Sequence, residues 1–168
     1  MKKISILFGV ILISNLAEAQ LIKEKSLNLQ IGRGFSSIDL INVDDGLYVQ
    51  GELALKVISW VELRPYIGLI FGNSRTLLTG GKVRVRPFRS PWLATFVEIG
   101  IGASIGKFRT LATFDNIEKE GIIYDIPFSF GVELGRDNNV SIGHAFYSQP
   151  SVEQFTGAFL VGIKFPLN

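Results

Sequence analysis

The stretch LYVQGELALKV, residues 47–57, decides the fold, because its apolar residues recur at every second position. Leu47, Val49, Leu53, Leu55 and Val57 fall on one face, together with Gly51. Tyr48, Gln50, Glu52, Ala54 and Lys56 fall on the opposite face. A period of two is typical of a β-strand, since a helix would distribute these apolar residues around its axis.

The same alternation recurs along the chain and predicts eight strands, within residues 27–31, 47–57, 61–71, 82–87, 93–105, 122–134, 140–146 and 159–165. Short connections are expected at 58–60, 88–91 and 136–138, and longer ones at 36–45, 73–80, 107–120 and 149–154. Outer-membrane barrels have this asymmetry, with short periplasmic turns and both chain ends in the periplasm. The sequence therefore predicts an all-β, eight-stranded, antiparallel, transmembrane up-and-down β-barrel.

The first 19 residues have the three parts of a secretory signal peptide. Lys2 and Lys3 precede the apolar run ISILFGVILI, and the small residues Ala17 and Ala19 follow it. The run is too short for a spanning helix, which needs about 20 apolar residues. We expect cleavage after Ala19, which leaves one barrel domain over residues 20–168.

The composition fits a membrane barrel better than a soluble domain. Charged residues make up 19% of the chain and the mean hydropathy is +0.32, against roughly 25% charged residues in soluble domains. Without Lys2, Lys3 and Glu18, the 17 basic and 15 acidic residues become 15 and 14. This near-neutral balance offers no basic surface for nucleic acid. Without cysteine, neither a disulfide nor a thiolate metal site is possible, and we expect no metal or other cofactor.

The polar faces of the expected strands carry charges of both signs among many glycines. We expect a lumen charge network of Glu52, Glu62, Arg64, Lys82, Arg84, Arg86 and Glu98. Small residues and paired opposite charges can fill the narrow interior of an eight-stranded barrel, which leaves no open pore. A secreted, soluble, lipocalin-like barrel stays open as an alternative, because alternation alone does not tell which face points inward.

His144 is the only histidine of the chain, and it shares its face with Ile142 and Phe146, so we expect it to face lipid. Phe130 is expected opposite it on the preceding strand. One explanation is an imidazole near the membrane interface, where it reaches headgroups or water. Another is a general base for a hydroxyl nucleophile that attacks a lipid ester. Ser148 is the nearest hydroxyl on that face, about 13 Å along an uninterrupted strand.

Four segments within residues 92–165 carry a resemblance to a known family: FVEIGIGASIG (96–106), FSFGVELG (128–135), SIGHAFYSQP (141–150) and GAFLVGIKF (157–165). In these segments the chain resembles the outer-membrane lipid A 3-O-deacylases. Members of this family are eight-stranded barrels whose catalytic histidine and serine lie on the lipid-facing side of the penultimate strand, in a His-x-Ser-Asn motif. The resemblance implies His144 as the base and Ser148 as the nucleophile. Two extra residues separate this pair here, and Gln149 stands where the family has asparagine.

Two functions are therefore expected as alternatives for a protein of the Gram-negative cell envelope. One is a hydrolase of lipid A esters that resembles the deacylases, with activity retained, degenerate or absent. The other is a non-enzymatic barrel of the structural or adhesion type. In both cases we expect contact with lipopolysaccharide in the outer membrane, and a monomer or a weak dimer.

Overall fold

A computed structural model describes residue 22 and residues 24–38, 41–71, 75–110, 117–152 and 154–167. The expected signal peptide lies outside these residues. The strands are β1 (Glu24–Ile38), β2 (Ile41–Ile58), β3 (Val61–Phe71), β4 (Thr76–Arg89), β5 (Leu93–Thr110), β6 (Ile117–Leu134), β7 (Val140–Gln149) and β8 (Gln154–Leu167). Two 3-10 turns, η1 (Arg136–Asn138) and η2 (Pro150–Val152), connect β6 to β7 and β7 to β8. In the described part of the chain, no helix has the length and apolarity to cross a membrane.

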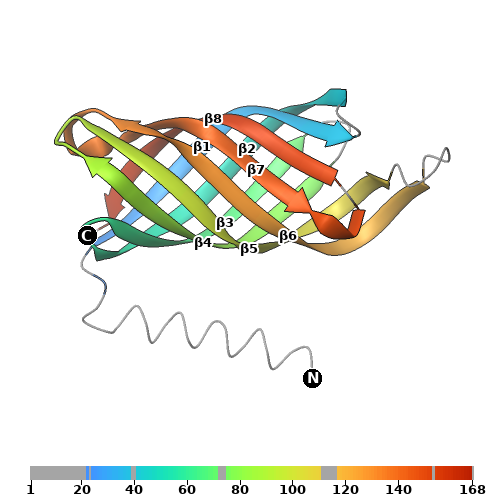
Figure 1. The fold of residues 1–168 in the computed structure, drawn as a ribbon, viewed down its shortest axis with the longest axis horizontal. Helices are drawn as coiled ribbons and strands as arrows, with labels where there is room; N and C mark the ends of the chain where they lie inside the picture. Colours follow the sequence, from blue (N-terminus) through green and yellow to red (C-terminus); the bar gives the residue numbers. More distant parts are fainter. Residues whose placement is uncertain are drawn as a thin grey trace, which may run out of the picture.

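The sheet closes into a barrel, because every strand pairs antiparallel with its sequence neighbours and β1 pairs with β8 (Figure 1). The predicted eight-stranded antiparallel barrel is thereby confirmed. The β1–β8 seam runs from Lys25 paired with Leu167 to Ser37 paired with Phe155, so both ends of the barrel chain lie together. We call this the turn end, since it also holds the short β2–β3, β4–β5 and β6–β7 connections, and we call the opposite end the hairpin end (Figure 1).

At the hairpin end the strands continue past the alternating stretches. Residues 36–45, expected as a connection, belong largely to β1 and β2, with Ser36 paired with Val43. Likewise, Lys107 pairs with Glu120 in the β5–β6 hairpin. These two expected connections are wrong, and the one expected at 73–80 is wrong from Thr76 on, where β4 begins. Alternation depends on the burial of one strand face, whereas backbone hydrogen bonding between strands does not require it.

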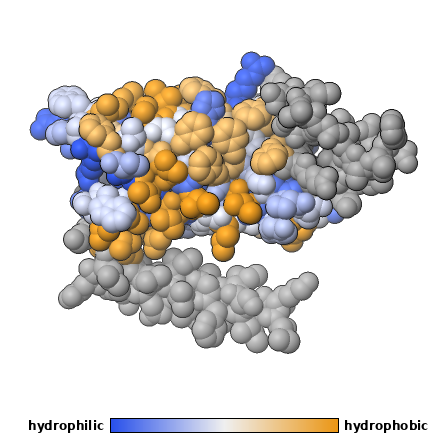
Figure 2. Space-filling model, in the orientation of Figure 1, coloured by the Kyte–Doolittle hydropathy of each residue, from blue (hydrophilic) through white to orange (hydrophobic). Residues whose placement is uncertain are grey.

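The barrel wall is apolar outside and polar inside. The outward-facing Ile99 and Ile101 are 60% and 79% exposed, whereas the inward-facing Gln50, Glu52 and Arg64 are each 1% exposed. Figure 2 shows hydrophobic side chains over the visible middle of the wall, with hydrophilic ones gathered toward its ends. A soluble lipocalin-like barrel needs its apolar residues inside. The structure therefore does not support that alternative.

A β-bulge near the turn end of β4 changes which residues face inward. Between Val85 and Phe88 the pairing with β5 shifts by one residue. Arg86 is buried on the inner side, and after the shift Arg89 pairs with Ala94, which is fully buried inside the barrel. Arg86 and Arg89 therefore both face inward, although an uninterrupted strand would place them on opposite faces.

Candidate functional site

The seven charged residues expected in the lumen all lie there, buried on four neighbouring strands. The strand register explains their grouping, because Arg84 of β4 lies opposite Glu62 of β3 on one side and opposite Glu98 of β5 on the other. Glu133 of β6 joins them, and its place on the polar face of residues 122–134 is the sequence signal that identifies it. The resulting lumen ion cluster consists of Glu52, Glu62, Arg64, Lys82, Arg84, Arg86, Glu98 and Glu133.

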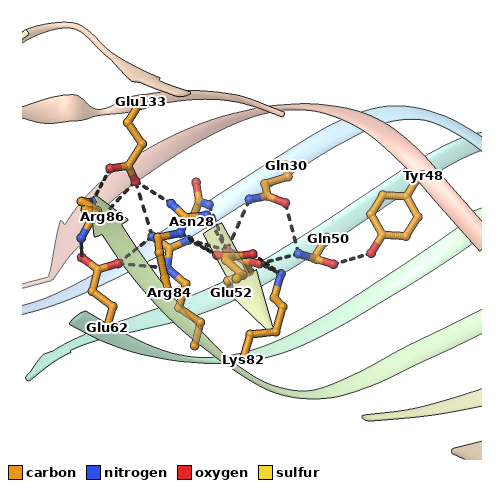
Figure 3. Close-up of polar contacts among 12 residues, drawn as sticks. Asn28, Gln30, Tyr48, Gln50, Glu52, Glu62, Lys82, Arg84, Arg86 and Glu133 are labelled. Atoms are coloured by element: carbon orange, nitrogen blue, oxygen red, sulfur yellow. Dashed lines mark hydrogen bonds and ion pairs between the residues drawn. The ribbon is translucent and has the colours of Figure 1, made fainter. Parts of the chain in front are cut away.

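Glu52 receives contacts from residues on four strands (Figure 3). Its Oε2 accepts hydrogen bonds from Arg64 Nη1 at 2.5 Å and from Asn28 Nδ2 at 3.1 Å. Its Oε1 accepts a hydrogen bond from Gln50 Nε2 at 2.5 Å and forms an ion pair with the Lys82 ammonium. Breaking a buried ion pair by removing one partner is strongly destabilising. Glu52 thus combines ion pairs with Arg64 and Lys82 and hydrogen bonds from amide side chains.

Arg84 and Arg86 connect the remaining carboxylates. Arg84 donates from Nε to Glu98 Oε1 and from Nη1 to Glu133 Oε1, each at 2.5 Å. Arg86 donates from Nε to Glu133 Oε2 at 2.5 Å, and its Nη1 lies 2.7 Å from Glu62 Oε1. Four carboxylates therefore face four cations, so the lumen ion cluster carries no net charge.

A second polar group fills the lumen toward the hairpin end, and the sequence analysis did not identify it. The hydroxyl oxygens of Tyr48 and Tyr147 lie 2.6 Å apart, and both hydroxyls donate to Gln50 Oε1. Tyr66 Oη donates to Asp125 Oδ1 at 3.3 Å. The available signal was the position of these residues on polar strand faces, since buried tyrosines and amides need hydrogen-bond partners. Together the two groups occupy the interior, as expected for eight strands.

Neither lumen group has the arrangement of a metal site. Each glutamate of the lumen ion cluster forms an ion pair with arginine or lysine. Among the residues that the structure describes, no three histidine, cysteine, aspartate or glutamate side chains are grouped so that they could hold a metal ion.

His144 lies on the outer wall, surrounded by phenylalanines. Its strand β7 pairs it with Phe130 of β6, as predicted, and with Phe159 of β8. Its ring centroid is 5.2 Å from that of Phe159, 5.7 Å from that of Phe130 and 6.1 Å from that of Phe146. Within the described ranges its side chain has these ring contacts and no hydrogen bond or ion pair. Aromatic packing therefore holds the imidazole.

The structure does not bring Ser148 to His144. Ser148 lies four residues farther along β7, where it pairs with Ile126 and Phe155. The register of β7 is continuous between the two residues on both sides, so no bulge shortens the distance of about 13 Å. A direct hydrogen bond between a serine nucleophile and its histidine base is not formed here. The catalytic roles of both residues stay predictions.

Comparison with protein-family models gives no match, and comparison with curated protein sequences gives none either. Solved structures do match. Neisserial surface protein A has a TM-score of 0.69 at 9% identity, over 85% of this chain and 97% of that protein. The attachment invasion locus protein Ail of Yersinia pestis has a TM-score of 0.57 at 9% identity, over 84% of this chain and 98% of that protein. The outer-membrane enzyme PagL has a TM-score of 0.51 at 13% identity, over 83% of this chain and 99% of that protein.

These likenesses define a class of fold. The chain is an eight-stranded barrel of the type found in small outer-membrane proteins. The matched proteins include an attachment protein and an enzyme, so the fold alone does not select an activity. The function must be argued from the surfaces and side chains of this chain.

Proposed function

We propose that this chain is a membrane-spanning scaffold of a bacterial outer membrane, which holds its four hairpins at the membrane surface. The observation that carries the proposal is the reversed polarity of the barrel, with an apolar outer wall around a charge-balanced interior. Such a wall suits lipid, because the closed ladder pairs the strand backbones and the charged side chains pair with one another inside the barrel, away from the apolar membrane. The filled lumen leaves the two ends and the outer wall as binding surfaces.

Aromatic side chains at both ends of the wall support this placement. Trp60 and Trp92 are 52% and 65% exposed near the turn end, and Phe71, Tyr124 and Phe155 are more than half exposed toward the hairpin end. Tryptophan and tyrosine concentrate where a membrane meets water. Because short turns face the periplasm in such barrels, we place the turn end and both chain ends there.

Cysteine labelling tests the location and the orientation, since the chain has no cysteine of its own. Ser59→Cys and Ser151→Cys introduce the same change at exposed sites of the turn end and the hairpin end, respectively. On intact cells, a maleimide too large to cross the outer membrane is expected to label Ser151→Cys and to leave Ser59→Cys unlabelled. Permeabilised cells should label both. The reverse pattern would contradict the orientation, and an absence from the outer-membrane fraction would contradict the proposal.

Lipid-ester hydrolysis at His144 is the second candidate, and one observation favours it. The imidazole borders an apolar hollow on the outer wall, together with Phe130, Val132, Ile142 and Phe159, where a lipid acyl chain can lie. In such a reaction the imidazole would take the proton of a hydroxyl group, whose oxygen would attack the acyl carbonyl carbon. The ester bond to the sugar oxygen would then break, and the imidazolium would protonate that oxygen. If the hydroxyl belongs to a serine, a water molecule would then attack the new acyl ester and release the fatty acid, with the proton returned to the serine oxygen.

Mass spectrometry of lipid A distinguishes the two candidates. We expect lipid A from cells with the wild-type chain, with His144→Ala and with an empty vector to have the same acyl chains, because no hydroxyl lies in hydrogen-bond contact with His144 in the described residues. Loss of one hydroxyacyl chain with the wild type, but not with His144→Ala, would establish hydrolysis instead. Ser148→Ala would then show whether that serine or a water molecule is the nucleophile.

A further inference from the structure

A cavity opens at the turn end of the barrel, next to the lumen ion cluster. Its volume is about 620 Å³, and residues of β1, β2, β3, β4, β8 and the η1 turn line it. Glu62 lines this cavity and also pairs with Arg86, so the cavity reaches the filled part of the lumen. One water molecule needs only roughly 10–15 Å³. This cavity, the turn-end vestibule, therefore has room for a hydrated ligand.

Two of the three carboxylates that line the vestibule are already paired. Glu62 Oε1 lies 2.7 Å from Arg86 Nη1, and Glu24 Oε1 lies 2.6 Å from Lys56 Nζ. The third belongs to Asp137, and in the described ranges it forms no ion pair. With Glu24 paired to Lys56 and Glu62 paired to Arg86, Asp137 opposes the three other cations of the lining, so two positive charges remain in excess.

Arg89 and Lys164 carry that positive charge. Arg89 faces the vestibule because of the bulge in β4, and its Nη1 donates to the backbone oxygen of Ser59 at 2.9 Å. Lys164 lies half-buried in β8, and its Nζ donates to the backbone oxygen of Asp137 at 3.2 Å. Neither cation forms an ion pair with a carboxylate of the described chain. Each retains N–H donors for a further acceptor.

We propose that the turn-end vestibule binds a phosphate-type oxyanion, with Arg89 and Lys164 as its charged donors. The planar guanidinium can bind two oxygens of one tetrahedral anion, and the ammonium adds a compact positive charge. Lys25 also lines the vestibule, and its positive charge offsets that of the Asp137 carboxylate. Inorganic phosphate and the phosphodiester of a phospholipid headgroup present the same chemistry.

Phosphate titration of the purified barrel tests this site. The protein is kept in a maltoside detergent, whose headgroup contains no phosphate, and sodium phosphate is added at constant ionic strength. Backbone amide resonances of the vestibule residues report binding, and the remaining resonances report that the barrel is folded. We expect Arg89→Gln to weaken binding roughly tenfold, and the double variant with Lys164→Gln to abolish it. Arg136→Gln, an exposed charge of the same end outside the vestibule, should change it less than about twofold.

A second arm identifies the source of the anion. Transfer of the barrel from maltoside into phosphatidylglycerol nanodiscs, without added phosphate, offers the phosphodiester headgroup. Shifts of the vestibule resonances with free phosphate support a soluble ligand, and shifts only on transfer into nanodiscs support a lipid headgroup. The resonance shifts seen in either arm must disappear in the double variant Arg89→Gln/Lys164→Gln. Shifts that persist in the double variant, or an absence of shifts in both arms, would overturn the proposal.

Discussion

Replacing Glu52 with glutamine is expected to lower the free energy of unfolding of the lipid-embedded barrel by about 3 to 5 kcal/mol. The side chain keeps its size, but the carboxylate shared by Arg64 and Lys82 is lost. The lumen ion cluster would then hold four cations against three carboxylates, with Arg64 and Lys82 only 1% and 2% exposed. Urea unfolding in lipid vesicles measures the change, with Trp60 and Trp92 as fluorescent probes at the turn end.

The matched control is Glu24→Gln, which makes the same change in an ion pair whose glutamate side chain is 67% exposed. Solvent screens that pair, so we expect an effect of about 1 kcal/mol or less. A second control adds Lys82→Met to Glu52→Gln. It restores the balance of charges and should recover part of the lost stability. Equal effects of Glu52→Gln and Glu24→Gln would contradict a stabilising role of the lumen ion cluster.

The fold was predictable because the period of two separates an apolar from a polar strand face, and the paired charges and glycines of the polar face indicated that this face points inward. That signal identified the strands and the inward position of residues such as Glu52 and Arg64. It could not identify Arg89, because the bulge in β4 reverses the alternation after Arg86 and nothing in the residue types between them requires a bulge. The sequence therefore did not predict the vestibule, although it predicted the lumen ion cluster.

Contacts within the candidate sites were predictable where they join two strands that a short turn connects. Phe130 was expected opposite His144 because a short turn fixes the β6–β7 register. Phe159 was not expected, since the longer β7–β8 connection does not fix its register from sequence alone. The pairing of Arg86 with Glu133 joins β4 to β6 across the lumen, and only the closed barrel brings these two strands together. Contacts across the interior thus required the structure.

Replacing Gly32 with alanine is expected to lower the free energy of unfolding by about 3 kcal/mol. Gly32 lies on β1, where it pairs with Leu160 across the seam that closes the barrel. A Cβ atom there would overlap the backbone carbonyl oxygen of Phe159 in β8. A backbone carbonyl fixed in a ladder cannot rotate away as a flexible side chain can, so β1 and β8 must separate locally. Urea unfolding in vesicles measures the loss of stability.

Gly81→Ala is the matched control, because a Cβ atom at Gly81 would meet no atom within 4 Å. Gly81 also lies within a strand and pairs on both sides, with Pro65 and Ile101, so the two variants differ mainly in the space around the new methyl group. We expect Gly81→Ala to change the stability by less than about 1 kcal/mol, since alanine restricts the unfolded chain more than glycine does. If Gly32→Ala is as stable as Gly81→Ala, the seam does not require this close approach of β1 and β8. If only Gly32→Ala is destabilised, closure of the barrel depends on a glycine that contributes no side-chain contact of its own.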